Sequence, residues 1–318
     1  GSMYKYIIIL SFLFFAVPLF IPVDPLAGTV DEKVLADEDS LFLSVGDIDV
    51  HYKMKQGDPK RNFILLHGFG SNLWTWEKIS KPLSKLGTVV SYDRPAFGLT
   101  SRPLSFVEKD PYSYEYQPEI FFQLMDRLKM EKTFIVANSA GADIAVRAYF
   151  TAPSRIDGII LIAPSLGDNN SSFSFFSKLA EVPQYERLGP LISRSLKDSG
   201  ESILKSAWYD PSRISEKDLE GYRKNILVNN WDTALWNFTK ASLYRTSVGR
   251  IENIKCPVLV LSGDSDVIIP LDKSMEVARK IKTSSFKVIE KCGHLPQEER
   301  PEELMAAIIE FITSLDSD

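Results

Sequence analysis

The chain has 318 residues, 44% apolar and 25% charged, which is ordinary for a globular protein and enough for one large domain or one domain with an insertion. Its formal net charge is -5 and it has no basic run interleaved with aromatic residues, so nucleic acid is excluded as an expected partner. Composition leaves the oligomeric state open.

The first 30 residues are interpreted as a hydrophobic signal or anchor segment that follows a tag scar, Gly1-Ser2. From Tyr6 to Val23 the sequence is uncharged and almost wholly apolar, at the lower edge of the length that spans a membrane. Lys5 before it favours an N-terminus on the inside, which predicts that the protein is exported or membrane-anchored with its main domain outside the cytoplasm. Cleavage of the segment, or a helix packed on the rest of the protein, are the alternatives.

Strands and helices then alternate, which predicts an α/β fold with a mostly parallel sheet and helices on both faces. Strands are expected near 42-52, 62-67, 87-92, 133-138, 158-163, 257-262 and 285-290. Helices are expected near 74-85, 117-130, 140-151, 271-281 and 301-315. Residues 40-164 and 251-316 would form the core of this fold.

Two of the three histidines come early in the chain. His51 lies in an alternating segment and is interpreted as an ordinary strand residue. His67 begins the loop His67-Gly68-Phe69-Gly70, directly after a buried-strand pattern. Glycines let such a loop turn tightly beside a ligand, so the backbone N–H of Phe69 is a candidate donor to a developing oxyanion.

The run Ala137-Asn138-Ser139-Ala140-Gly141 places a serine on a sharp turn between a strand and a helix. A serine hydroxyl is a weak nucleophile, so it must be held clear of its own backbone, where a base can take its proton. Small residues two positions on either side allow that turn, although alanine stands at the first position where glycine is usual. Ser139 is therefore the candidate nucleophile, and the Ala140 N–H is the second candidate oxyanion donor.

Residues 165-250 show helix-like segments without convincing strands and are predicted to form an inserted helical lid. Most of its aromatic residues are expected to pack a small core, and a few to line an apolar pocket. These aromatics are Phe173, Phe175, Phe176, Trp208, Tyr209, Tyr222, Trp231, Trp236 and Phe238.

The candidate base is His294, because it is the only histidine after Ser139 and lies on a Gly/Pro-punctuated loop after a predicted strand. A third group must orient its imidazole. Asp264 and Asp266 both follow the buried-strand run 257-262, and Asp266 is preferred because Asp264 is as well placed to cap the turn. Asp168 is a minor alternative.

The two cysteines are predicted to be free thiols. Cys256 precedes one strand and Cys292 follows a parallel one, so they lie at opposite edges of the sheet. Five or six residues of strand separate those edges by roughly 17 to 20 Å, beyond the disulfide limit of about 7 Å. No metal site is expected, because only Cys292 and His294 have ligand spacing.

Together these motifs resemble the α/β-hydrolase superfamily, in particular an esterase-like member with a serine nucleophile. The resemblance covers roughly Phe42 to Leu315, and the order Ser139, Asp266, His294 is the order of nucleophile, acid and base in that superfamily. It extends to the loop Asp93 to Thr100, where the family often has Asp-x-x-Gly-x-Gly-x-Ser; this loop is interpreted as structural.

The resemblance implies an α/β-hydrolase fold and hydrolysis of carboxylic esters of small, apolar substrates, with no metal or organic cofactor. Carbon–carbon bond hydrolases and lactonases share the same three residues and remain open. Serine at position 139 argues against the dehalogenases and epoxide hydrolases of the superfamily, which use aspartate there. A non-catalytic ligand-binding protein on this fold and a membrane-tethered scaffold are alternatives of other classes.

Overall fold

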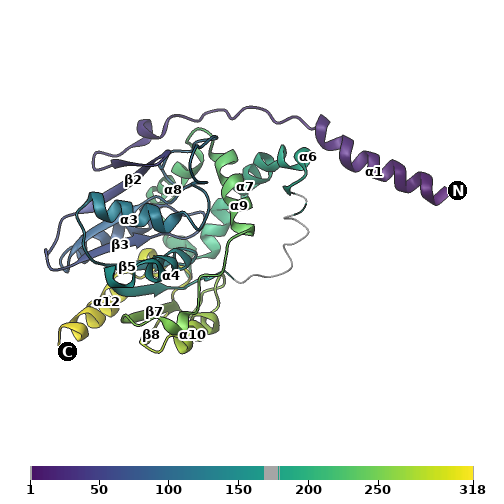
Figure 1. Cartoon of the computed structure of the whole chain (residues 1–318). Coiled ribbons are helices and arrows are strands. Elements are labelled where there is room, and N and C mark those ends of the chain that lie inside the picture. The colour runs from purple at the N-terminus through teal and green to yellow at the C-terminus, as the bar shows by residue number, and fades with distance from the viewer. Residues whose placement is uncertain (1, 168–177, 179, 318) are drawn as a thin grey trace.

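The computed structural model describes residues 2–167, 178 and 180–317 (Figure 1). Its centre is a sheet of eight strands in the order β1-β2-β4-β3-β5-β6-β7-β8. The pairs β1·β2 and β2·β4 are antiparallel and the other five pairs are parallel, which confirms the predicted mostly parallel sheet. The strands are β1 Leu41–Val45, β2 Ile48–Lys55, β3 Asn62–Leu66, β4 Thr88–Tyr92, β5 Thr133–Asn138, β6 Ile156–Ile162, β7 Val258–Gly263 and β8 Ser284–Ile289.

The single strand predicted near 42-52 is a hairpin. Val45 of β1 pairs with Ile48 of β2 across a two-residue turn, and Gly46 at its first position has a φ of +54°. A two-residue hairpin of this kind requires a left-handed residue there, which glycine supplies at no steric cost. The alternating apolar positions are odd-numbered before the turn and even-numbered after it, so the pattern shifts by one residue at Gly46-Asp47, which the reading as one strand overlooked.

Helices cover both faces of the sheet. On one face, α3 (Gln117–Arg127), α4 (Gly141–Thr151) and α10 (Leu271–Lys280) contribute to one apolar core. On the other, α2 (Glu77–Leu83) and α12 (Pro301–Asp316) contribute to a second. Alternate strand residues serve the two cores, as Ile64 and Phe63 of β3 illustrate.

Helical segments follow β6 and precede β7, and within the described part of 165-250 no strand is present. They are α6 Pro183–Glu186, α7 Gly189–Ser206, η5 Pro211–Arg213, α8 Glu216–Arg223, η6 Lys224–Ile226 and α9 Trp231–Leu243. One isolated bridge joins Val228 to Val30 of the N-terminal linker. The division into a core and a lid remains a prediction, and the aromatics Phe173, Phe175 and Phe176 lie outside the described residues.

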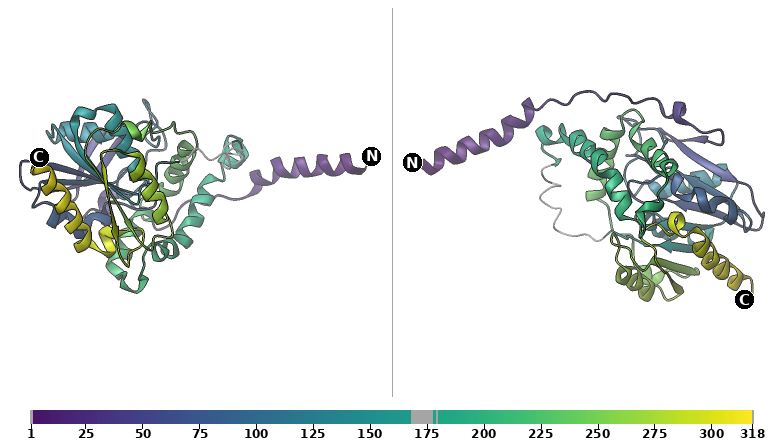
Figure 2. Two further views of the ribbon diagram at one scale, coloured as in Figure 1. Left: turned by 90° about the horizontal axis from the view of Figure 1, so that it is seen from below. Right: turned by 180° about the vertical axis from the view of Figure 1, so that it is seen from behind.

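The apolar N-terminal segment forms one helix, α1 (Ser2–Phe20), which projects away from the sheet (Figures 1 and 2). Its mean hydropathy is 2.0, and by length and composition it could cross a membrane. Nearly all of its side chains are exposed, and it contacts α6 near its C-terminal end, where Tyr185 Oη donates to the Phe14 carbonyl over 2.8 Å. The helix is therefore mostly exposed rather than buried, and its contacts with α6 lie in its C-terminal half.

Cys256 lies just before β7 and Cys292 just after β8, and both are free thiols, as their positions relative to the strands predict.

Candidate active site

Ser139 follows the last residue of β5 and has a φ of +52°, and only Ala140 separates it from the first residue of α4. This left-handed conformation is costly for a residue with a side chain and persists only where the surroundings hold it. Here the Ser139 N–H donates to the Ile162 carbonyl, and the Ser139 carbonyl accepts from Ala142 and Ser165, each over 3.0 Å. The turn between β5 and α4 is thus tied to β6 and to the first turn of α4.

Small residues flank this turn for steric reasons. At Gly141 a Cβ would lie 2.4 Å from the Leu66 carbonyl oxygen, so no side chain fits there without a shift of backbone. Ala137 is fully buried within β5, and its methyl group is accommodated at the position where glycine is usual.

Asp266 and His294 form a buried pair. Asp266 Oδ2 lies 2.7 Å from His294 Nδ1, and the two side chains are 0% and 7% exposed. The other carboxylate oxygen accepts the N–H groups of Ile268 and Ile269 over 2.8 and 2.9 Å. A carboxylate held in this way accepts a hydrogen bond from Nδ1–H, which leaves the Nε2 lone pair of a neutral imidazole free to act as a base.

Ser139 and His294 line the same cavity, whose volume is about 650 Å³. Within the described residues no hydrogen bond joins the Ser139 hydroxyl to the imidazole. A hydrogen bond between a nucleophile and its base often forms only when substrate binds, so Ser139 and His294 can still act as such a pair. The structure thus brings Asp266 to His294 by direct contact, and brings Ser139 to the same cavity.

The loop of Gly68, Phe69, Gly70 and Ser71 lies directly against Ser139. A Cβ built on Gly68 would be 3.0 Å from the Ser139 Cβ. The Ser71 N–H donates to the Gly68 carbonyl over 3.4 Å, and Gly70 has a φ of +72°, as the third residue of a type II turn requires. Within the described residues, neither the Phe69 nor the Ala140 amide donates a hydrogen bond, and both are free to bind an anion.

His67 is a buried structural residue. Its Nδ1 donates to the Gly68 carbonyl over 2.8 Å, and its Nε2 accepts the Arg94 N–H over 2.9 Å. Burial, assisted by the Arg94 charge, lowers the pKa of His67 to about 4, so the imidazole stays neutral at ordinary pH. It therefore fixes the loop that carries Phe69.

His51 was predicted to be an ordinary strand residue, and it does lie in β2, but its side chain belongs to a buried chain of hydrogen bonds. Its Nδ1 is 2.7 Å from Asp93 Oδ2, and its Nε2 is 2.7 Å from Ser40 Oγ. Asp93 also accepts the Leu73 and Leu99 N–H groups, each over 2.7 Å. The loop that begins at Asp93 is thus a structural element, in agreement with its interpretation from the sequence.

The rival acids are placed elsewhere. Asp264 accepts from the Ser265 hydroxyl over 2.8 Å and from the Cys292 N–H over 3.3 Å, which holds a turn and lowers the pKa of its carboxyl despite partial burial. Asp168 lies outside the described residues.

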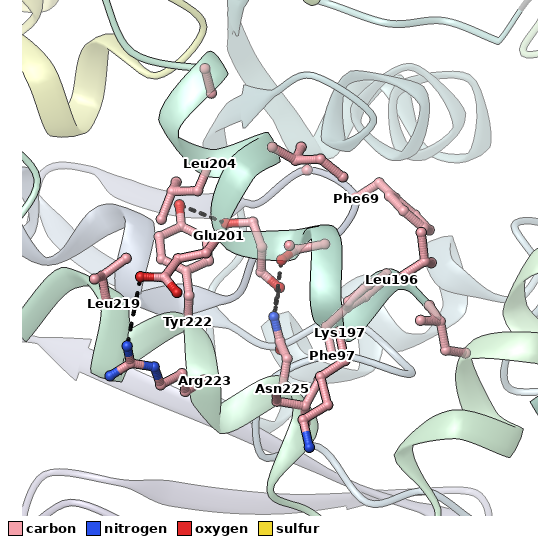
Figure 3. Close-up of a pocket in the computed structure, with 18 of the residues that line it drawn as sticks. Phe69, Phe97, Leu196, Lys197, Glu201, Leu204, Leu219, Tyr222, Arg223 and Asn225 are labelled. Carbon is pink, nitrogen blue, oxygen red and sulfur yellow. Dashed lines mark hydrogen bonds and ion pairs between the residues drawn. The ribbon is translucent and has the colours of Figure 1, made fainter. Parts of the chain in front are cut away.

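The helical segment supplies most of the remaining cavity wall (Figure 3), which is mainly apolar and also includes the charged residues Lys197, Asp198, Glu201 and Arg223. Two aromatics that the sequence could not single out, Tyr222 and Trp231, line it, whereas Trp236 and Phe238 are buried in packing. The aliphatic residues of the wall are Leu196, Ile203, Leu204, Leu219, Ile226, Leu227, Leu235, Ile268 and Leu295.

Two acidic residues that follow His294 were missed at the level of sequence. Glu299 accepts the Gly293 N–H over 2.8 Å and the Asp210 N–H over 2.8 Å, and so joins the His294 loop to the helical segment. Glu298 accepts from the Thr75 hydroxyl over 2.5 Å and from the Tyr222 hydroxyl, and burial raises the pKa of Glu298 to about 7. The pair Glu298-Glu299 resembles a solvated helix start, so the sequence carries no signal for either role.

No group of three or more His, Cys, Asp or Glu side chains among the described residues could hold a metal ion.

A family model described as alpha/beta hydrolase fold matches residues 61–301. A relative, the 2-hydroxy-6-oxononadienedioate/2-hydroxy-6-oxononatrienedioate hydrolase 1 of Pseudomonas putida, is 26% identical over 297 residues, which cover 87% of this chain and 97% of the relative. Human monoacylglycerol lipase ABHD6 is 25% identical over 265 residues, covering 80% of this chain and 76% of the lipase.

Among solved structures, one titled as a membrane phospholipase A and bacterial virulence factor matches 100% of this chain and 98% of its own, with a TM-score of 0.69 and 22% identity. At that identity the match shows a shared fold. The family model, however, spans well over half of the sequence. The chain therefore belongs to the α/β-hydrolase fold family and is a hydrolase of that fold.

Proposed function

We propose that this hydrolase cleaves carboxylic esters through an acyl-enzyme, with Ser139 as nucleophile, His294 as base and Asp266 as the group that orients His294. One observation carries the proposal: the buried pair of Asp266 and His294, joined at 2.7 Å, opens onto the same cavity as a serine held at a φ of +52°. A shared cavity and a carboxylate bound to the imidazole support this assignment, because a nucleophile, its base and an orienting acid must lie at one site to act together.

In the first half of the reaction, Ser139 Oγ attacks the ester carbonyl carbon while His294 Nε2 takes the hydroxyl proton. The oxygen of the tetrahedral intermediate carries a negative charge, which the free N–H groups of Phe69 and Ala140 receive. Ala140 precedes the first residue of α4, so the positive end of that helix adds to the stabilisation. The bond to the leaving oxygen then breaks, and His294 gives that oxygen its proton.

In the second half, water attacks the acyl carbon, loses a proton to His294 Nε2 and releases the carboxylic acid from Ser139. Asp266 keeps its negative charge throughout and stabilises the imidazolium that forms twice per cycle. No step requires a metal or an organic cofactor.

The substrate is proposed to be a small molecule with an apolar acyl or alkyl chain. The cavity wall is formed largely by leucine, isoleucine, phenylalanine and tryptophan side chains, and apolar chains lose water favourably on such a surface. The relative named as a monoacylglycerol lipase acts on an ester of this kind by its name, which supports the assignment.

We further propose that α1 anchors the protein in a membrane, with the rest of the chain outside the cytoplasm. Most of its apolar surface is exposed among the residues that the structure describes, and Lys5 near its start favours the inside. The match of a structure titled as a membrane phospholipase A to the whole chain is consistent with such an arrangement.

Hydrolysis of a carbon–carbon bond is the second candidate, because a relative is named as a 2-hydroxy-6-oxo-dienedioate hydrolase. Its dienedioate substrate carries two carboxylates by its name, whereas the wall around Ser139 and His294 is mainly apolar, so the ester reaction is preferred. A lactone is a cyclic ester and falls within the proposed chemistry.

The test uses the full chain in detergent and its Ser139→Ala variant. We expect a fluorophosphonate to label the protein at Ser139, and p-nitrophenyl esters of increasing chain length to be hydrolysed with a preference for medium or long chains. Ser139→Ala should lose the label and at least about 10³-fold of the activity.

An unlabelled Ser139 would favour a non-catalytic ligand-binding protein on this fold. Labelling without ester turnover, combined with turnover of a 2-hydroxy-6-oxo-dienoate, would favour the carbon–carbon hydrolase. Activity in cells that survives Ser139→Ala would favour a membrane-tethered scaffold.

A further inference from the structure

Asn225 joins the helical segment between β6 and β7 to the loop that carries a proposed oxyanion donor. It lies in η6, directly after α8, and its side chain is aimed at the loop of Gly68, Phe69, Gly70 and Ser71 (Figure 3). Its Nδ2 donates to the Gly70 carbonyl over 3.0 Å and to the Ser71 carbonyl over 3.2 Å. The residue thus holds the second half of the turn whose second residue is Phe69.

The side-chain amide of Asn225 also binds the loop from Asp93 to Thr100. Asn225 Oδ1 accepts the N–H of Gly98, which follows Phe97 on the Asp93 loop. A carbonyl can only accept and an N–H can only donate, so these three partners fix which end of the amide is oxygen and which is nitrogen. The Phe97 ring in turn packs edge-on against Phe69, with centroids 5.6 Å apart.

Reciprocal contacts hold Asn225 itself in place. Asn72 Nδ2, from the residue after the turn, donates to the Gly221 carbonyl of α8 over 3.0 Å. The buried Arg102 guanidinium donates to the backbone carbonyl of Gly98 over 2.8 Å and to the backbone carbonyl of Asn225 over 3.4 Å. The end of α8 and η6 is therefore a fixed part of the wall beside the turn.

We propose that Asn225 is a positioning residue for hydrolysis: it sets the orientation of the 68–71 turn and thereby the direction of the Phe69 N–H toward the oxyanion. This proposal rests on the proposed ester hydrolysis at Ser139. An oxyanion donor works only when it is aimed at the place where charge develops, and an error of about 1 Å can cost about 10²-fold in rate.

The experiment compares Asn225→Ala and Asn225→Asp with the unmodified full chain in detergent. The aspartate keeps the oxygen that accepts from Gly98, but it turns both contacts with the Gly70 and Ser71 carbonyls from attraction into repulsion. We expect kcat per fluorophosphonate-titrated site to fall by about 10- to 100-fold in both variants, with KM changed by less than about threefold. Affinity for an alkyl boronic acid, whose adduct with serine mimics the tetrahedral intermediate, should fall by the same factor as kcat.

Asn230→Gly is the matched control. Asn230 also donates from the helical segment to a backbone carbonyl, that of Arg102 at 3.4 Å, but not to the 68–71 turn. Its φ of +63° is one that glycine adopts freely, so the control removes only the amide. We expect its kcat and its boronic acid affinity to stay within about twofold of the unmodified chain.

Unchanged kcat per site in both Asn225 variants would overturn the proposal, and so would an equal loss in the control. If the unmodified chain hydrolyses no ester, the proposed function fails by itself. The positioning role is then decided by hydrogen exchange: faster exchange of residues 68–72 in both Asn225 variants, but not in the control, supports it, and equal exchange overturns it.

Discussion

At the scale of single residues, Asp264 and Asp266 are separated by how their oxygens are used. One carboxylate oxygen of Asp266 accepts from His294 and the other accepts from two backbone N–H groups. Asp264 instead accepts the Cys292 N–H and so stabilises a turn. Both are aspartates on the same short loop, so only the direction of the side chain tells them apart.

Asp266→Asn should lower kcat by about 10³- to 10⁴-fold with little change in KM, because the amide favours the wrong imidazole tautomer. Steady-state ester hydrolysis, with a melting temperature for each variant, is the measurement. Asp264→Asn is the matched control, and its kcat should stay close to that of the unmodified chain. A large loss in the control and none at position 266 would reverse the assignment.

Glu298 gives a prediction for stability against pH. Burial raises the pKa of Glu298 to about 7 from an ordinary value of 4.5, so between these values the native state binds more protons than the unfolded chain. This group therefore destabilises the protein progressively as the pH rises from about 4.5 to about 7. Glu298→Gln keeps an acceptor for Thr75 and Tyr222 and removes the charge.

The variant should be more stable than the unmodified chain at pH 8, by on the order of 3 kcal/mol, and nearly equal to it below pH 4.5. Urea unfolding at several pH values between 4 and 8 gives the two curves. Curves that run parallel over this range would show that Glu298 does not titrate there.

At the scale of elements, the start of α4 depends on close contact between its backbone and β3. A Cβ at Gly141 would meet the Leu66 carbonyl at 2.4 Å, whereas a Cβ at Gly200, inside α7, would meet no atom within 4 Å. The two glycines thus have opposite roles: the first permits the turn at Ser139, and the second only weakens a helix.

Gly141→Ala should destabilise the protein by about 1–3 kcal/mol and lower activity, because α4 and the Ala140 N–H must shift. Gly200→Ala should stabilise it by about 0.5–1 kcal/mol, since glycine costs that much in a helix interior. Urea midpoints of both variants test the pair. Equal effects of the same sign would contradict the role given to the β3–α4 contact.

At the scale of the whole molecule, we expect membrane binding to depend on α1 and hydrolysis to depend on the rest of the chain. It projects from the rest of the chain, and the cavity wall contains none of its residues (Figure 2). Deleting residues 2–23 should therefore abolish co-sedimentation with phospholipid vesicles. Hydrolysis of a short, water-soluble ester should remain of the same order.

Vesicle sedimentation of both forms, followed by p-nitrophenyl acetate hydrolysis in the supernatant, measures the two properties independently. A truncated form that still binds vesicles would place the membrane contact elsewhere. A truncated form that binds none and has lost its activity would make α1 part of the active fold.

The local sequence predicted the alternation of elements, the parallel sheet and the family, because those depend on patterns of two to twenty neighbouring residues. The turn at Ser139 was recognisable for the same reason: small residues must stand next to a serine that is held at a positive φ. The hairpin at Gly46 was missed because the two short strands follow each other directly, although the Gly-Asp pair and the one-residue shift of the alternation at that pair were visible.

Tertiary structure alone decided which side chains meet. Nothing near Asn225, Glu298 or Glu299 in the sequence distinguishes them from exposed polar residues, and each has a partner tens to hundreds of positions away. The same holds for the choice of Tyr222 and Trp231 as cavity wall among the aromatics of 165-250. Sequence patterns record the local periodicity of burial, whereas a site depends on contacts across strands and loops that only the folded chain brings together.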